Sequence, residues 1–335
     1  MRAIEQTAVG LVADTRLAWS SPLWSPVEHL RLSSGVRVVR PALLTLKQLK
    51  AASHAVASPE THGCYHPRDD WRPLTAAELA LVLGISADGL GRTVQVFEIP
   101  QEIVLTGRKA AEVSIAAGTA ERRSRGAWQV RGQALASLAE HMDRWMANEV
   151  CADFRHGCDY GPFIRINPPG RTSTTGYLGD GWDGLHVDNW GGSVWLQQRR
   201  TYQGSRFVLN LGTETRYFIY VNLKLTAMLR LLEGRVPEAI SSLLGEPRFA
   251  AIGLTASAFL EHFSDYPMLK IALPPGHGYV ANTSELAHDG FIPGLTGDDL
   301  ALLIPHKVNS IVGSQASLVV RPPQYLDSWA RSLKP

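Results

Sequence analysis

The stretch Gly184-Leu-His-Val-Asp-Asn-Trp190 contains two potential metal ligands, His186 and Asp188, separated by one residue. Because side chains of an extended strand alternate between its faces, a His-x-Asp pair places both ligands on the same side. Far downstream, His288 offers a third ligand. Two neutral imidazoles and one carboxylate form one triangular face around a metal ion and leave the opposite face open. The pattern predicts a metal centre built from these three residues.

Short alternating runs surround this pair and indicate an antiparallel sheet system. Gly, Pro, Asn and Thr separate the runs, as is typical of consecutive strands joined by turns. The runs include FIRIN (163–167), RFVLNLG (206–212), TRYFIYVNLKL (215–225) and LKIAL (269–273). Residues 225–266 instead have helical spacing and predict a helical insertion. We therefore expect an α+β chain with a mainly β core from about residue 160 to 322.

The order of these features resembles the Fe(II)/2-oxoglutarate-dependent oxygenases. The His-x-Asp strand is followed by the Pro275-Gly276 turn, and His288 comes twelve residues after Gly276 (288 − 276). The resemblance covers about half of the chain and implies the double-stranded β-helix, or jelly roll, found in cupins. It implies a core at 160–322, an N-terminal α/β region at 1–159 packed on that core, and a C-terminal tail at 323–335.

The same resemblance implies the chemistry. His186, Asp188 and His288 would hold Fe(II), 2-oxoglutarate would be the co-substrate, and O2 would be the oxidant, with succinate and CO2 released. No catalytic residue beyond the metal ligands is implied. His306, in LLIPHKV, also follows a strand and is an alternative third ligand. The spacing from Gly276 favours His288.

A cation that binds the distal carboxylate of 2-oxoglutarate is harder to find. In many members of the family an Arg lies about ten residues after the last His, but here that stretch contains Asp298 and Asp299 and no Arg. Candidate cations elsewhere are Arg165, Arg206, Arg216 and Arg321. An Arg is favoured because its planar fork matches a carboxylate.

Residues 206–223 resemble the strands that follow the His-x-Asp motif in amino-acid and peptidyl-aspartate hydroxylases. That resemblance favours Arg206 and Asn210 as co-substrate contacts. We expect Arg321 to be the distal clamp, with Arg216 as the second choice.

The resemblance to amino-acid and peptidyl hydroxylases implies an amino acid, a peptide or a peptide-like secondary metabolite as substrate. Trp190 and Trp195 would form an apolar wall beside the metal, and Arg171 would bind a substrate carboxylate. Related halogenases replace the ligand carboxylate by a small residue. Asp188 therefore favours hydroxylation, desaturation or cyclisation of the substrate.

Two other functions fit parts of the sequence. A cupin enzyme, either a dioxygenase or an isomerase, would use the metal without 2-oxoglutarate, and the missing Arg after His288 supports it. A DNA-binding regulator would use residues 74–95, because LTAAELALVLGIS resembles the start of a helix-turn-helix. The net charge of +2 does not favour a nucleic-acid partner.

Composition favours a cytoplasmic enzyme acting on a small molecule or peptide. The 335 residues include only three cysteines, as expected in a reducing compartment, and no run approaches the ~18 apolar residues of a membrane span. The sequence leaves the oligomeric state open.

Overall fold

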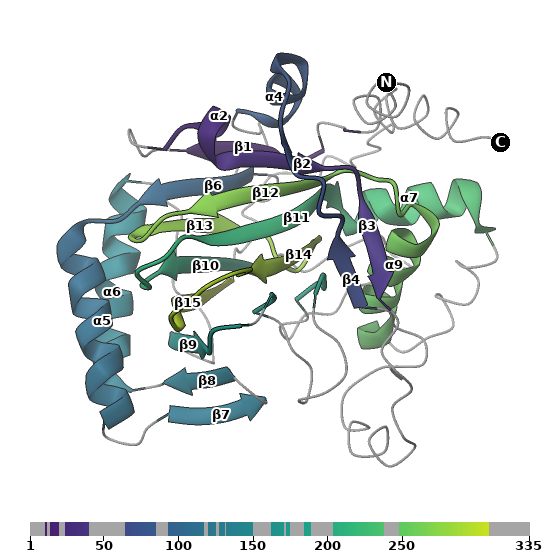
Figure 1. Cartoon of the computed structure of the whole chain (residues 1–335). Helices are drawn as coiled ribbons and strands as arrows, with labels where there is room; N and C mark the ends of the chain where they lie inside the picture. The colour runs from purple at the N-terminus through teal and green to yellow at the C-terminus, as the bar shows by residue number, and fades with distance from the viewer. Residues whose placement is uncertain are drawn as a thin grey trace, which may run out of the picture.

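The structure is a computed structural model in which two large sheets face one another (Figure 1). It describes residues 11, 14–19, 24–39, 64–84, 93–116, 120–124, 127–130, 132–149, 162–170, 172–174, 184–188, 204–237 and 248–307. Several residues named above lie outside these ranges: Arg171, Trp190, Trp195 and Arg321, together with the tail at 323–335.

The larger sheet has eight strands. In order across the sheet they are β1 (Arg16–Trp19), β6 (Thr93–Glu98), β13 (His277–Ala281), β10 (Gly204–Asn210), β15 (Asp299–Lys307), β9 (Phe163–Asn167), β8 (Ala127–Val130) and β7 (Ala120–Ser124). Neighbouring strands are antiparallel, except that β1 runs parallel to β6.

The smaller sheet has five strands, all antiparallel to their neighbours. In order they are β14 (Leu286–Phe291), β11 (Arg216–Lys224), β12 (Met268–Leu273), β2 (Leu30–Ser33) and β5 (Arg72–Pro73). Residues 184–188 lie along the outer side of β14, where His186 pairs with His288. A separate hairpin-like pair consists of β3 (Val36–Val39) and β4 (Cys64–Pro67).

The strand order is that of a jelly roll. From β9 onward the chain visits the larger sheet, then residues 184–188 beside β14, then β10 in the larger sheet and β11 and β12 in the smaller one. It then crosses to β13 in the larger sheet, returns to β14 in the smaller sheet, and crosses again to β15, the last described strand. Eight described segments are thus divided equally between two facing sheets, which is the arrangement of the double-stranded β-helix that the family resemblance implied. The fold prediction is confirmed.

Residues before 160 contribute strands to both sheets. β6 and β1 extend the larger sheet beyond β13, while β2 and β5 extend the smaller sheet beyond β12. β7 and β8 add to the opposite edge of the larger sheet, next to β9. These strands pair the backbone groups that the edges of the core would otherwise expose.

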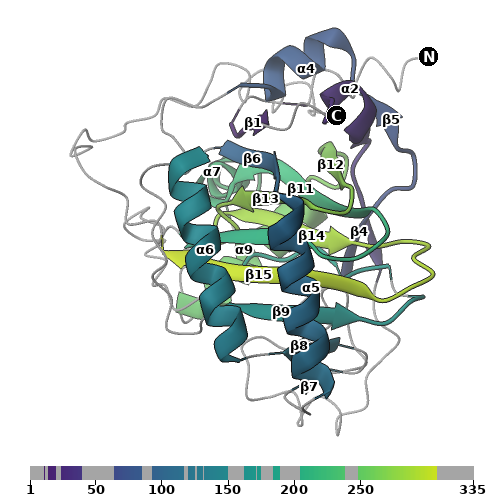
Figure 2. The ribbon, with the colours of Figure 1, turned by 90° about the vertical axis from the view of Figure 1, so that its left-hand side faces the viewer.

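Helices cover the outer faces of both sheets. α5 (Gln101–Ala116) and α6 (Gln133–Glu149) cross the larger sheet side by side (Figure 2), and their apolar side chains pack on Phe207 and Leu209 of β10. α7 (Leu225–Arg235) and α9 (Arg248–His262) lie between β11 and β12 in the chain, within the expected insertion, and pack on the smaller sheet. A one-turn helix, α2 (Pro26–His29), precedes β2.

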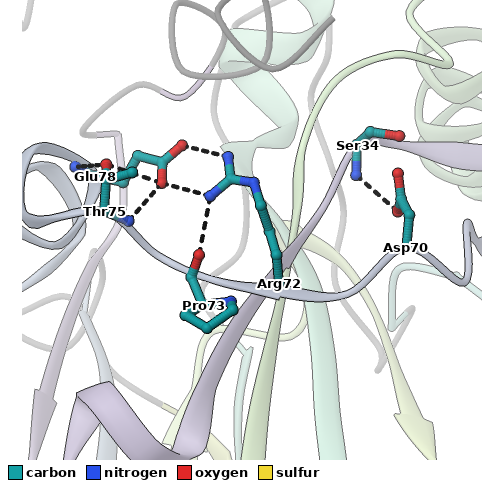
Figure 3. Close-up of polar contacts among 6 residues, drawn as sticks. All are labelled: Ser34, Asp70, Arg72, Pro73, Thr75 and Glu78. Carbon is teal, nitrogen blue, oxygen red and sulfur yellow. Dashed lines mark hydrogen bonds and ion pairs between the residues drawn. The ribbon is translucent and has the colours of Figure 1, made fainter. Parts of the chain in front are cut away.

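An ion pair between the partly exposed Arg72 and the buried Glu78 anchors the short helix α4 (Ala76–Val82), as Figure 3 shows. Thr75 caps the helix by accepting a hydrogen bond from the Glu78 backbone N–H, and the Glu78 carboxylate accepts from the Thr75 backbone N–H. This reciprocal arrangement is a capping box. Arg72 donates to both Glu78 oxygens, at 2.7 and 2.8 Å.

The segment expected to resemble a helix-turn-helix is only partly described. Its first helix is α4, and Gly84 follows with a positive φ of 122°. Residues 85–92 lie outside the described part of the chain, and β6 occupies residues from 93 onward. Among the described residues, no helix has the length and apolar character needed to cross a membrane.

Candidate metal centre

Backbone pairing brings His186 and His288 together. The two residues exchange hydrogen bonds, from His186 N–H to His288 O at 2.9 Å and from His288 N–H to His186 O at 2.8 Å. Directly paired residues of antiparallel strands project on the same face, so their rings lie with centroids 4.5 Å apart. Asp188 is fixed by its own N–H, which donates to Thr283 O at 2.9 Å in the turn before β14.

Gly184 allows this segment to approach β4 closely. Its φ is 131°, a conformation that L side chains rarely adopt, and a Cβ there would overlap the Tyr65 carbonyl oxygen. The Tyr65 carbonyl instead accepts from the Leu185 N–H at 3.0 Å. The glycine two residues before His186 therefore sets the position of the ligand segment.

The three side chains present their ligand atoms to one point. One potential ligand atom from each of His186, Asp188 and His288 lies within 4.8 Å of the others. Asp188 Oδ1 is 3.5 Å from His186 Nε2, and Asp188 Oδ2 is 3.6 Å from His288 Nε2. The structure thus brings the three predicted residues together.

Hydrogen bonds of the other ring nitrogens orient both imidazoles. His186 Nδ1 lies 3.1 Å from Gly184 O, and His288 Nδ1 lies 2.9 Å from Leu286 O. A carbonyl can only accept, so each Nδ1 carries the proton and each Nε2 keeps its lone pair for the centre. This is the tautomer that a metal-binding histidine requires.

Electrostatics keep the ligands in the forms that bind a cation. Burial and, secondarily, the neighbouring His186 lower the pKa of His288 to about 3, so the ring is neutral near pH 7. Burial alone would raise the pKa of Asp188, but Arg206 and the two histidines hold it well below its usual range. Asp188 Oδ2 is buried and has no hydrogen-bond partner among the described residues. A buried carboxylate oxygen that lacks a hydrogen-bond partner and lies 3.6 Å from the His288 Nε2 lone pair fits a metal ion.

Arg206 lies against the ligand carboxylate. Its Nη2 is 2.7 Å from Asp188 Oδ1, and both side chains are buried. Arg206 reaches Asp188 from β10, in the sheet opposite β14 (Figure 1). The structure therefore places this predicted co-substrate residue at the metal ligand itself.

Arg216 has unused hydrogen-bonding capacity in the interior. Its side chain is 6% exposed, and Nε and Nη1 have no hydrogen-bond partner among the described residues. Asp299 Oδ1 lies 3.6 Å from Nη1, while Asp299 Oδ2 accepts from Asn167 Nδ2 at 2.8 Å. Gly290 gives this arginine room, because a Cβ there would come within 3.1 Å of Arg216 Nη2. Two free donors on a buried guanidinium fit an anionic ligand.

Asn210, a predicted co-substrate contact, forms hydrogen bonds within the protein at the end of β10. Its amide donates to Glu214 O at 2.9 Å and to Leu273 O at 2.8 Å, and its oxygen accepts from the Gly212 N–H at 2.9 Å. One amide hydrogen bond therefore holds the β10–β11 connection, and the other joins the end of β10 to the end of β12. A strand-terminal Asn commonly serves turns in this way.

The rival ligand His306 lies on β15, where its backbone is opposite Ser205 of β10. β15 belongs to the larger sheet, whereas His186 pairs directly with His288 beside the smaller one. The pairing favours His288 as the third ligand.

Sequence reasoning did not assign a role to Asp299 or Asn167. Asp299 lies in the stretch where the family pattern places an Arg, and that stretch contains no Arg to bind the distal carboxylate. In the structure it is buried and faces Arg216. Arg165, which was only a candidate, belongs to the same interior. Burial lowers its pKa to about 10, with Arg206 adding to the effect.

Comparisons with known proteins give structural similarity only. Neither a protein-family model nor a curated protein matches the chain. HygX from Streptomyces hygroscopicus, solved with nickel and 2-oxoglutarate, is similar over 70% of this chain and 88% of its own, with 14% identity and a TM-score of 0.38. The Kdo hydroxylase KdoO, described as a non-haem Fe(II) alphaketoglutarate-dependent dioxygenase, is similar over 65% of this chain and 80% of its own, with 13% identity and a TM-score of 0.35. A KdoO complex with alphaketoglutarate and Fe(III) gives 14% identity and the same TM-score. At these values the fold of this chain rests on its own strand order, and the candidate site on its own side chains.

Proposed function

We propose that this protein is an Fe(II)- and 2-oxoglutarate-dependent oxygenase that hydroxylates an unactivated C–H bond. The observation that carries the proposal is the His186–Asp188–His288 cluster, with both Nε2 atoms and an unpartnered carboxylate oxygen converging inside a double-stranded β-helix. Two histidines and one carboxylate on one face are the ligand set of non-haem Fe(II) oxygenases.

Iron in this site would supply the redox chemistry that couples O2 reduction to conversion of 2-oxoglutarate into succinate and CO2, with one oxygen atom entering the substrate. The residues of the chain supply the environment. His186 and His288 offer neutral lone pairs, and Asp188 offers negative charge. The apolar interior around Tyr220 and Tyr279 keeps water away from the reacting groups.

Charge balance supports a dianionic co-substrate. Among the described residues, three arginines (Arg165, Arg206, Arg216) and three aspartates (Asp188, Asp289, Asp299) interact electrostatically around the candidate metal centre. These charges cancel, so a divalent metal would leave the interior with a net positive charge that is costly to bury. A dicarboxylate such as 2-oxoglutarate restores neutrality, and a monocarboxylate does not.

Arg216 is the described residue best suited to hold the distal carboxylate. It is buried, it forms an ion pair with Asp299 at 3.6 Å, and two of its donor nitrogens have no hydrogen-bond partner among the described residues. In this proposal the clamp comes from β11, while β15 supplies the carboxylate that faces the clamp. Arg321 lies outside the described residues and stays a sequence-based candidate.

For the substrate we propose an amino acid, a peptide or a peptide-like secondary metabolite, acted on in the cytoplasm. The proposal rests on the resemblance of residues 206–223 to amino-acid and peptidyl hydroxylases. Trp190, Trp195 and Arg171 are the proposed substrate contacts. The presence of Asp188 supports hydroxylation, because a halogenase would lack this ligand.

Anaerobic titration of the metal-free protein with Fe(II) and then 2-oxoglutarate tests the proposal. A chelated Fe(II)–2-oxo acid gives a weak visible band at roughly 500 nm. We expect this band in the wild type and not in the Asp188→Ala variant, followed by succinate release once a substrate is present. Metal binding without the band would favour a cupin enzyme that does not use 2-oxoglutarate. Failure of the wild type to bind metal would refute the proposal.

A further inference from the structure

The two carboxylate oxygens of Asp188 have different surroundings. Each oxygen lies near one imidazole, with Oδ1 3.5 Å from His186 Nε2, but only Oδ1 is also 2.7 Å from Arg206 Nη2, a distance typical of a charge-assisted hydrogen bond. Oδ2 is buried, lacks a hydrogen-bond partner among the described residues, and lies 3.6 Å from His288 Nε2. One oxygen is therefore engaged by the protein, and the other remains for a cation.

We propose that Arg206 is a positioning residue that makes Asp188 a one-oxygen metal ligand. This inference rests on the proposed metal site. By holding Oδ1, Arg206 prevents the carboxylate from rotating to offer both oxygens to the ion. Oδ2 alone then completes the triangular face with His186 and His288.

The number of Asp188 oxygens that bind the metal determines how many of its coordination positions stay open. A carboxylate bound through both oxygens takes one position more than a carboxylate bound through one. A 2-oxo acid that chelates through two atoms, together with O2, needs the whole face opposite the ligand triangle. Arg206 would thus reserve one position for the reactants.

Its location makes Arg206 suited to this role. It is held on β10 between β13 and β15, where its backbone is opposite Ala281 and Pro305. The side chain reaches from the larger sheet to the ligand segment and is 11% exposed. No other arginine of the described residues lies within ion-pair distance of Asp188. A strand in the middle of a sheet is a rigid base for such a contact.

The positive charge of Arg206 determines how its removal should change the affinity for a metal ion. A guanidinium close to a divalent cation repels it, so Arg206 does not act by tightening metal binding. In Arg206→Met we expect Mn(II) to bind as tightly as in the wild type, or more tightly, because Asp188 gains a second contact. A residue needed only to build the site would instead weaken Mn(II) binding when removed.

Counting the water molecules bound to Mn(II) tests the proposal without 2-oxoglutarate or turnover. The Mn(II)-loaded protein is measured by pulsed electron paramagnetic resonance in ¹⁷O-enriched water. We expect Arg206→Met to hold one bound water fewer than the wild type, and Arg206→Lys, which keeps a cationic donor, to restore it. Arg165→Met is the matched control, because it removes a nearby positive charge that is not paired with Asp188.

The outcomes separate this proposal from the proposed function. An unchanged water count in Arg206→Met, or loss of Mn(II) binding in a folded Arg206→Met, would overturn the positioning role while leaving the metal site intact in the wild type. The same loss of a water in Arg165→Met would show that charge, and not the contact with Oδ1, sets the coordination. A wild type that binds no Mn(II) would instead refute the metal site.

Discussion

Two arginine–carboxylate pairs in this molecule, each with a buried carboxylate, differ in how many hydrogen bonds the carboxylate accepts. At α4, both Glu78 oxygens accept hydrogen bonds, from Arg72 and from Thr75. In the interior, Arg206 engages one oxygen of Asp188, and the other oxygen has no partner among the described residues. The two carboxylates are similarly buried, at 1% and 6% exposure. Burial therefore does not distinguish them, whereas the orphaned oxygen does, because native structures rarely leave such an atom unpaired without a ligand.

The largest expected effect comes from removing the Asp188 carboxylate, whose Oδ2 lacks a hydrogen-bond partner among the described residues. Asp188→Ala should weaken Fe(II) or Mn(II) binding by more than about 1000-fold, or about 4 kcal/mol, because a charged ligand is lost from a three-ligand site. Calorimetric metal titration measures this change. Glu78→Gln is the matched control and should bind metal as the wild type does. Equal affinities in the wild type and Asp188→Ala would contradict the assignment of Asp188.

Loss of the Arg72–Glu78 ion pair should lower the stability of the protein without changing metal binding. Arg72→Met should lower the free energy of unfolding by about 3 kcal/mol, because it leaves the buried Glu78 carboxylate without its cation. Urea denaturation measures this loss. The double variant Arg72→Met/Glu78→Leu should recover much of it, since no buried charge remains. A loss in the double variant as large as in the single variant would show that packing, not charge, stabilises α4.

Arg216 and Asp299 form another arginine–carboxylate pair, with a longer distance of 3.6 Å between Nη1 and Oδ1. Arg216→Met should raise the dissociation constant of 2-oxoglutarate by about 30-fold, or about 2 kcal/mol, because a charged hydrogen-bonding partner is lost. Anaerobic titration monitored by the visible band measures this constant. Fe(II) affinity should stay unchanged, since Arg216 pairs with Asp299 and not with a ligand. Wild-type affinity for 2-oxoglutarate in this variant would reassign the clamp to another cation, such as Arg321.

Acid should destabilise the metal-free protein through His288. The pKa of this residue is about 3 in the folded protein and 6.5 when unperturbed, so the unfolded chain binds more protons between these values. The free energy of unfolding should therefore fall as pH drops from 6.5 towards 3, by up to about 1.4 kcal/mol per pH unit from this group. Denaturation at several pH values, with a chelator present, measures the slope. His288→Gln should flatten it, and an identical slope in that variant would contradict the buried neutral state.

Residues that act through chain-local geometry were predictable from the sequence. His186 and Asp188 share a strand face because of the two-residue period, and the Gly276–His288 spacing selected the third ligand. The alternating runs also predicted an antiparallel sheet system, and the resemblance to the oxygenases implied the jelly roll that the strand order confirms. The helices α7 and α9 lie where helical spacing replaced strand alternation.

Residues that act through partners across the barrel were not predictable in the same way. The sequence shows that Arg206 and Asn210 are four positions apart on one strand, so both were expected to contact the co-substrate. In the structure Arg206 contacts Asp188 from the facing sheet, while Asn210 bonds to Glu214 before β11 and to Leu273 of β12. Their roles depend on which groups lie opposite them in the folded protein. The alternation of residues along one strand does not identify those groups.

The sequence by itself determined the ligand types, their shared strand face and the β architecture, because these follow from side-chain chemistry and local alternation. Only the tertiary structure decided which carboxylate oxygen stays free, and which cation faces Asp299 at the point where a family Arg was expected. The physical reason is that the two sheets come together through contacts between residues far apart in the chain. Buried charges then pair with whatever the opposite sheet provides, and this pairing leaves Asp188 Oδ2 and the Arg216 donors available for a metal and an anion.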